Sequence, residues 1–202
     1  MKEDTYKTID IASEETLFKE KGSKFFGYAF PVLSENDVKD CLEVLKKKHH
    51  SARHFCYAYQ IGVEHTQYRA NDDGEPNNSA GLPIYGQIQS FEVTNTLIVS
   101  VRYFGGIKLG VGGLISAYKK SAQLALTASE IIEKTINVQF KLTFNYDLMN
   151  PVMRIIKEKQ IEIVHQKLEM DCTYIILVRK SDANRIFQIF EALHKVLITK
   201  EE

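Results

Sequence analysis

Residues 96–128, TLIVSVRYFGGIKLGVGGLISAYKKSAQLALTA, contain the pattern around which the rest of the chain is organised. The run 97–101 is apolar and largely β-branched, which is typical of a buried strand. A loop with five glycines in nine positions follows, and a helix is predicted from about Leu114. The sequence therefore predicts a buried strand that leads through a glycine-rich turn into a helix.

The glycine-rich turn is suited to bind an anion. Glycines permit positive φ and let backbone amides approach a ligand, and the next helix adds its N-terminal amides and the positive end of its dipole. No known phosphate motif matches, because the Lys-Ser/Thr of a P-loop is missing and Ile115 replaces the third glycine of G-x-G-x-x-G. Close packing of helix and strand explains the same glycines, so both interpretations stay open. The candidate ligand- or phosphate-binding residues are Arg102, Gly105, Gly106, Lys108, Gly110, Gly112 and Gly113.

Composition limits the class of protein. The 26 basic and 26 acidic side chains cancel, which disfavours a protein that coats nucleic acid non-specifically but leaves room for one basic face. No apolar run approaches the roughly 20 residues that cross a bilayer, and the first ten residues lack the apolar core of a signal peptide. The three cysteines are widely spaced without a C-x-x-C pair, as in reduced proteins. We therefore expect a cytoplasmic protein without a membrane segment.

The order of predicted elements indicates two domains and an α+β fold. Residues 1–135 contain predicted strands at 23–32 and 53–62, a helix at 35–50 with Ser34 as N-cap, a long polar loop at 64–82 and a short helix that ends near 89. In the second strand, one face is predicted to carry His54, Cys56, Ala58 and Gln60, and the other Phe55, Tyr57, Tyr59 and Ile61. Residues 136–202 read β-α-β-β-α-β, the split βαβ of a ferredoxin-like domain, with Asp147 as the cap of the first helix and Asp182 at the start of the second. The expected boundary lies near residue 135.

The polar loop carries the candidate catalytic residues His54 (on the preceding strand), Asp72, Asp73 and Glu75. The three carboxylates suit a Mg²⁺ site or a general base, but Asp-Asp-Gly-Glu-Pro is also an ordinary turn composition. The motifs of a nucleophile elbow, a zinc protease and a kinase are absent, and His49, His50 and His54 match no zinc pattern. We predict no metal and no cofactor, and we expect a binding protein rather than an enzyme. A hydrolase or phosphoryl-handling enzyme that uses residues 72–75 is the alternative.

The acidic segment at residues 72–75, which we call the acidic loop, and the glycine-rich turn at residues 105–113 both follow strands. If these strands are neighbours and parallel, the two loops share one edge of the sheet and form a single cleft. The polar residues of that cleft would be His54, Asp72, Asp73, Glu75, Arg102 and Lys108.

Several segments together resemble the IMPACT family of YigZ-type proteins. They are Lys21-Gly-Ser-Lys-Phe25, His54-x-Cys-Tyr-Ala-Tyr59, Asp72-Asp-Gly-Glu-Pro76, and Ala80-Gly-x-Pro-Ile84. The most specific is VRYFGGxxLGxGGL at 101–114, followed by Ala117-Tyr118. Ser79 and Ser116 depart from the family pattern, where Thr and Arg are common, and Ser116 removes a positive charge from the helix start.

The resemblance implies a fold and a function. It implies an N-terminal domain similar to the ribosomal-protein and elongation-factor α/β fold, a sheet backed by two helices with a left-handed crossover, and a ferredoxin-like C-terminal domain. This pair is similar to the last two domains of elongation factor G, and eukaryotic relatives modulate the kinase pathway that limits translation initiation during starvation. We therefore expect a regulator of translation that binds RNA, the ribosome, a translation factor or another translation-regulating protein. The phosphate contacts would come from Arg102, Lys108, Lys119 and Lys120, and Tyr103 or Phe104 would stack on bases unless they are core residues.

Overall fold

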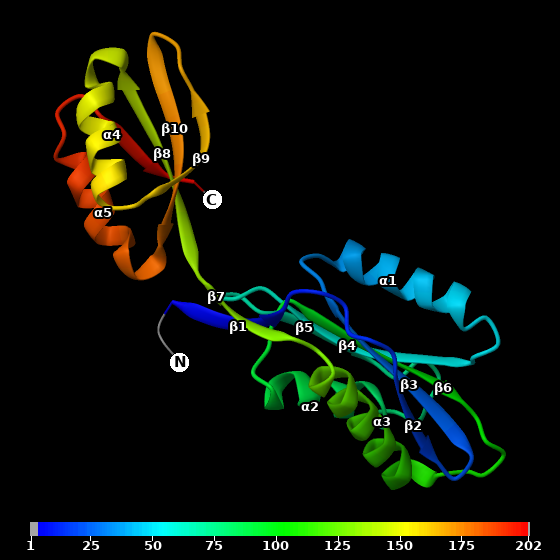
Figure 1. Cartoon of the computed structure of the whole chain (residues 1–202). Helices are drawn as coiled ribbons and strands as arrows, with labels where there is room; N and C mark the ends of the chain where they lie inside the picture. The colour runs from blue at the N-terminus through cyan, green and yellow to red at the C-terminus, as the bar shows by residue number, and fades with distance from the viewer. Residues whose placement is uncertain (1–3, 202) are drawn as a thin grey trace. The chain divides into compact units, whose positions relative to one another are not determined.

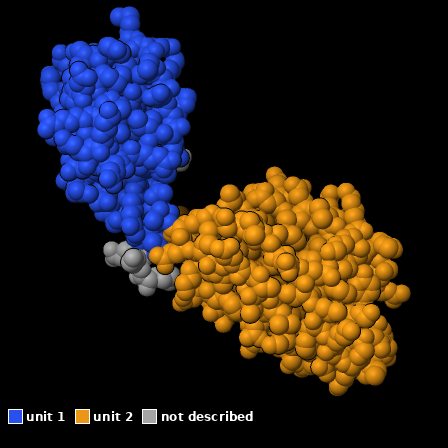
Figure 2. All heavy atoms as spheres, in the orientation of Figure 1, with its two compact units in different colours: residues 1–5, 135–202 blue, residues 6–134 orange. Residues whose placement is uncertain are grey.

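The computed structural model describes residues 4–201, which form a mixed α/β structure (Figure 1). They divide into two compact units (Figure 2): residues 6–134 make the N-terminal unit, and residues 135–201 with residues 4 and 5 make the C-terminal unit. Within residues 4–201, no helix combines the length and apolar character needed to cross a membrane.

The N-terminal unit is built on a five-stranded sheet with the order β2-β3-β6-β4-β5. The apolar run before the glycine-rich turn forms the central strand β6 (Thr96–Tyr103), whose residues are buried from Thr96 to Arg102. Every neighbouring pair in this sheet is antiparallel. The other strands are β2 (Thr16–Glu20), β3 (Ser23–Pro31), β4 (His54–Ile61) and β5 (Gln67–Asn71), while β1 (Thr5–Ile9) and β7 (Ile131–Thr135) form a separate two-stranded sheet.

Helices cover both faces of this sheet (Figure 1). The helices α2 (Gly81–Ser90) and α3 (Gly110–Thr127) pack on one face, and α1 (Glu35–Lys48) packs on the other. Side chains of β4 pack into the hydrophobic cores on both faces of the sheet. Cys56 and Ala58 belong to the core under α2 and α3, whereas Phe55 and Tyr59 belong to the core under α1. This alternation was predicted from the period of two. Ser34 caps α1 through a capping box, as predicted.

The predicted loop at 64–82 is partly wrong, because β5 lies inside it and pairs with β4 as a hairpin. The side chains of β5 are exposed or half-buried, so backbone pairing at the sheet edge, rather than burial of an apolar face, holds this strand. An edge strand of this kind leaves no hydrophobic period in the sequence.

The C-terminal unit has the element order β-α-β-β-α-β, and its antiparallel sheet has the order β11-β8-β10-β9. Helices α4 and α5 share one hydrophobic core with the sheet. Neither helix has a side-chain cap bond, since short 3₁₀ turns precede both, so the predicted cap at Asp147 is wrong. The elements are β8 (Asn137–Asn145), α4 (Met149–Glu158), β9 (Glu162–Lys167), β10 (Asp171–Arg179), α5 (Ala183–Glu191) and β11 (Leu197–Lys200).

Candidate functional site

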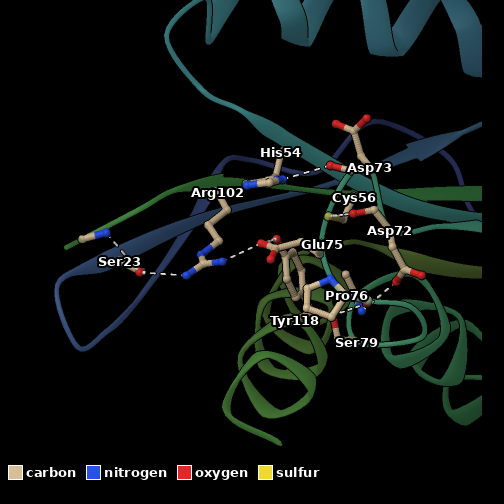
Figure 3. Close-up of polar contacts among 12 residues, drawn as sticks. Ser23, His54, Cys56, Asp72, Asp73, Glu75, Pro76, Ser79, Arg102 and Tyr118 are labelled. Atoms are coloured by element: carbon tan, nitrogen blue, oxygen red, sulfur yellow. Dashed lines mark hydrogen bonds and ion pairs between the residues drawn. The ribbon is translucent and has the colours of Figure 1, made fainter. Parts of the chain in front are cut away.

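A buried polar cluster joins the end of β6 to the acidic loop (Figure 3). Arg102 Nη1 donates to Glu75 Oε1 at 2.6 Å, and the Tyr118 hydroxyl of α3 donates to the same oxygen at 2.7 Å. Ser23 Oγ, at the start of β3, accepts from Arg102 Nη2 at 3.4 Å and from the Gly105 amide at 3.2 Å. The side chains of Arg102 and Glu75 are only 6% and 5% exposed. This ion pair is therefore internal, and the prediction that Arg102 contacts a phosphate is not supported, because Glu75 neutralises its charge inside the unit.

Asp72 has a structural role at the start of α2. Its Oδ1 accepts from the amides of Ala80 and Gly81 at 2.9 and 2.8 Å, and its Oδ2 accepts from the Asn78 amide at 2.8 Å. A carboxylate at this position satisfies helix N-terminal amides and stabilises the positive end of the dipole. Both oxygens of Asp72 thus bind the protein's own backbone.

Asp73 and His54 fix the acidic loop to β4. Asp73 Oδ2 accepts from the Phe55 amide at 2.7 Å, and the Asp73 carbonyl lies 2.9 Å from His54 Nδ1. His54 Nδ1 therefore bonds the loop backbone and not a carboxylate or a thiol. Among residues 4–201, no group of three or more His, Cys, Asp or Glu side chains is placed to hold a metal ion.

The Cys56 thiol is buried next to the acidic loop. It is fully buried, and its Sγ donates to the Asp72 carbonyl at 3.0 Å. Burial raises the pKa of the Cys56 thiol, and burial likewise raises the pKa of the Tyr118 hydroxyl. A thiolate is the nucleophilic form of cysteine, so this environment disfavours Cys56 as a nucleophile.

The acidic loop reaches the end of β6, but the expected route through a neighbouring parallel pair of strands is wrong. Strand β4 is antiparallel to β6, with His54 opposite Arg102 in the register. Strand β5 turns the chain back, so it runs in the same direction as β6 and delivers the acidic loop to the end of the sheet where β6 finishes. The β4–β5 hairpin therefore brings the acidic loop to the end of β6, where Glu75 contacts Arg102 at 2.6 Å. A neighbouring parallel pair of strands was expected to have this effect.

The five glycines of the turn have different surroundings. A Cβ on Gly105 would lie 1.9 Å from the carbonyl carbon of Gly22, so close packing accounts for this residue. A Cβ on Gly106, Gly110 or Gly112 would meet no atom within 4 Å, and the first two have φ of +84° and +72°. Helix α3 begins at Gly110, earlier than the predicted Leu114, so Gly110, Gly112 and Gly113 belong to its first turn.

The surface around the turn is open and partly apolar. The N-cap residue of α3, Leu109, makes no side-chain cap bond, and Lys108 is exposed. Phe104 and Ile107 are each 56% exposed, so Phe104 is not a core residue. We define the glycine-turn face as Phe104, Ile107, Lys108 and the first turn of α3, together with Lys24, which lines a hollow with Phe104.

A hollow of about 240 Å³ adjoins this face where β3 begins and β6 ends, and we call it the β3–β6 hollow. Sequence reasoning missed Lys24 and Phe26 as site residues, because only the pairing of Lys24 with Tyr103 across the two strands brings them there. Their presence in or beside the Lys21–Phe25 motif was the one available signal. The lining residues are Gly22, Lys24, Phe26, Tyr103 and Phe104.

Comparisons with known proteins agree on one family. Residues 21–126 match the Impact N-terminal domain. The IMPACT family member YvyE of Bacillus subtilis is 35% identical over 156 residues, which are 77% of this chain and 71% of YvyE. An IMPACT family member of Haemophilus influenzae is 30% identical over 201 residues, which are 90% of this chain and 96% of that protein.

A solved structure shows the same fold. The crystal structure of a hypothetical protein superimposes with a TM-score of 0.73 and covers 98% of both chains at 21% identity. The matched segment 21–126 contains the whole polar cluster, from Ser23 through Glu75 and Arg102 to Tyr118. The chain belongs to the IMPACT family.

Proposed function

We propose that this protein regulates translation by binding RNA of the translation machinery through the glycine-turn face. Membership of the IMPACT family is the first support, because the resemblance in the sequence motifs implies a role in translation. A translation-regulating protein as the partner is the competing outcome that the experiment below has to distinguish.

The observation that carries the proposal is unpaired positive charge beside open backbone. Lys24 and Lys108 are exposed, and neither side chain forms an ion pair or hydrogen bond with a described residue. The first turn of α3 adds amides without a side-chain cap, which favours a phosphate group at this position. Lysine side chains that contact phosphates give affinity without sequence readout. The neutral net charge of the chain is compatible with this because the charge is local.

The acidic loop supports binding rather than catalysis. Each of the three carboxylates accepts at least one hydrogen bond from the protein itself: Asp72 uses both oxygens, Glu75 is buried against Arg102, and the exposed Asp73 binds the Phe55 amide through Oδ2. No contact among the described residues favours the hydrolase alternative.

We also infer domain types for the two units. The element order and sheet order of the C-terminal unit support a ferredoxin-like domain that begins near residue 136. The N-terminal unit, with α2 and α3 on one sheet face, supports the elongation-factor-like α/β type, to which α1 adds cover on the opposite face.

Co-sedimentation with ribosomes over a series of salt concentrations tests the function. The double variant Lys24→Ala/Lys108→Ala is expected to bind more weakly and to reduce the slope of log affinity against log salt by about 1.4 to 1.8, since each lost phosphate contact accounts for about 0.7 to 0.9. The matched control is Lys46→Ala/Lys47→Ala, which removes the same charge from the exposed last turn of α1. Equal binding by both variants and the unsubstituted chain contradicts the proposal, and weaker binding with an unchanged salt slope points to a protein partner.

A further inference from the structure

The β3–β6 hollow has the chemistry of a base-binding site, and we propose that it seats one unpaired base of a single-stranded RNA. The inference rests on the proposed function, because it names the class of ligand for the glycine-turn face. It goes further in one respect: it assigns a contact that depends on stacking and not on charge.

Three aromatic rings stand around the hollow. Phe26 and Tyr103 meet edge to face, with ring centroids 5.6 Å apart, and Phe104 adds a third ring. More than half of Phe104 is exposed, as 56% of its surface is open to solvent. Aromatic faces bind bases of any sequence because every base has a π-face. A hollow with several rings and one lysine therefore suits a nucleotide better than an aliphatic ligand.

The rings are held in place by buried polar groups. The Tyr103 hydroxyl hydrogen bonds with Nδ1 of His49 at 3.0 Å, and His49 itself is buried. The Phe104 ring lies with its centroid 5.6 Å from the guanidinium carbon of Arg102, and Arg102 is fixed by Glu75. A ligand that enters this hollow does not have to order its walls, and preorganisation of this kind lowers the entropic cost of binding.

The charge around the hollow selects a phosphate-bearing ligand. Lys24 lines it, and the exposed Lys21 precedes Gly22 on the same turn. Neither lysine side chain forms an ion pair or hydrogen bond with another described residue. Gly22, which also lines the hollow, packs closely on the Gly105 backbone, since a Cβ on Gly22 would lie 2.8 Å from the Gly105 carbonyl oxygen. One base among the rings and its phosphate beside Lys24 account for both the apolar and the charged part of the lining.

The ligand has to be unpaired. In a duplex both faces of each base are covered by neighbouring bases, so a protein ring can reach a base face only in a single strand, a loop or a bulge. This requirement separates the hollow from general phosphate binding, which a duplex satisfies equally well.

Fluorescence anisotropy with the full chain tests the inference. The probes are a labelled single-stranded RNA oligonucleotide of mixed sequence, the same RNA annealed to its complement, and a free mononucleotide. Phe104→Leu keeps an apolar side chain but removes the π-face, and it is expected to weaken single-strand binding about 5- to 100-fold. Its salt slope stays unchanged because no charge is lost, whereas Lys24→Ala lowers the slope by about 0.7. Phe104→Tyr restores the affinity.

The matched control is Tyr68→Leu. Tyr68 on β5 is 58% exposed, and β5 is not adjacent to β3 or β6 in the sheet. This control is expected to bind like the unsubstituted chain, and a thermal melt of each variant shows that it is folded. The inference is wrong if Phe104→Leu binds as tightly as Tyr68→Leu, if the duplex binds as tightly as the single strand, or if no single strand binds. Preferential binding of the free mononucleotide also contradicts it, because it assigns the site to a small metabolite.

The two proposals fail separately. If the lysine double variant loses ribosome binding while Phe104→Leu still binds the oligonucleotide normally, the hollow inference is wrong and the proposed function stands. If Phe104→Leu loses oligonucleotide binding in a chain that never sediments with ribosomes, the hollow binds a base and the proposed function is wrong.

Discussion

Glu75→Gln is expected to destabilise the N-terminal unit more than any exposed charge change. Glu75 is the only carboxylate that contacts the Arg102 guanidinium among the described residues, and the Arg102 side chain is 6% exposed. Glutamine keeps the shape and the hydrogen bond from Tyr118, but it leaves a buried positive charge without a counter-charge. Arg102 has little else to rely on, because its Nε is buried without a hydrogen-bond partner and its bond to Ser23 is long at 3.4 Å.

The size of the effect follows from this geometry. Removal of one partner of a buried ion pair costs about 3 to 5 kcal/mol. For a chain of this size, each kcal/mol corresponds to about 2 to 4 °C in Tm, so the expected decrease is about 6 to 20 °C. The same substitution at Glu43, which is exposed on α1, is expected to change the free energy of unfolding by less than about 0.5 kcal/mol.

The assay has to separate the two units. Hydrogen exchange followed by mass spectrometry is expected to show faster exchange of β6 amides in Glu75→Gln and unchanged exchange of β10 amides in the C-terminal unit. Adding Arg102→Met removes the unpaired charge, so the double variant is expected to be more stable than the sum of the single effects by about 1 to 3 kcal/mol. The reasoning is refuted if Glu75→Gln melts like Glu43→Gln, or if the two substitutions are additive.

Three further predictions concern a glycine pair, a histidine and the thiols. Gly105→Ala is expected to cost about 1 to 3 kcal/mol because its Cβ would lie 1.9 Å from a backbone carbon, whereas Gly112→Ala, with no atom within 4 Å, is expected to keep or raise Tm. Burial lowers the pKa of His49, so the stability linked to its neutral form is present above about pH 6.5 and lost as the pH falls below that value. Urea midpoints measured from about pH 7.5 to about pH 5.5 are therefore expected to fall further for the unsubstituted chain than for His49→Gln, and equal slopes would contradict this. With a thiol reagent, only the partly buried Cys41 is expected to react in the native protein and all three thiols after unfolding, so rapid labelling of Cys56 would show that it is not sealed.

Prediction from the sequence was most accurate where the residue pattern within one helix or strand determines its structure. The central strand, the Ser34 cap and the two-faced pattern of β4 were predicted correctly, because burial imposes a period of two and a helix start requires a side-chain acceptor. The edge strand β5 was missed because it buries no apolar face. The cap predicted at Asp147 was wrong, because Asp147 lies within a 3₁₀ turn and Leu148 is the N-cap residue of α4.

The candidate site was only half predictable. Proximity of the acidic loop to the glycine turn was expected, but the burial of Arg102 was not, because nothing local distinguishes an arginine that meets a ligand from one that meets Glu75. The β3–β6 hollow was not predicted at all. It exists because the antiparallel register places Lys24 opposite Tyr103, and register is a property of two strands that no single segment specifies.

The buried ion pair between Arg102 and Glu75 is connected to the β3–β6 hollow through the Phe104 ring, which lines the hollow and packs on Arg102. Arg102 joins three segments that are distant in sequence: Ser23 at the start of β3, Glu75 in the acidic loop and Phe104 after β6. Tight packing of Gly105 on Gly22 closes the same corner from the other side. A charge that is costly to bury is stabilised here only because all three segments are in place, so loss of Glu75 is expected to release the Phe104 ring as well as to lower stability. Weaker single-strand binding by Glu75→Gln, at a temperature where the unit is still folded, would therefore link the core of the domain to its surface, whereas unchanged binding would show that Phe104 is positioned without Arg102.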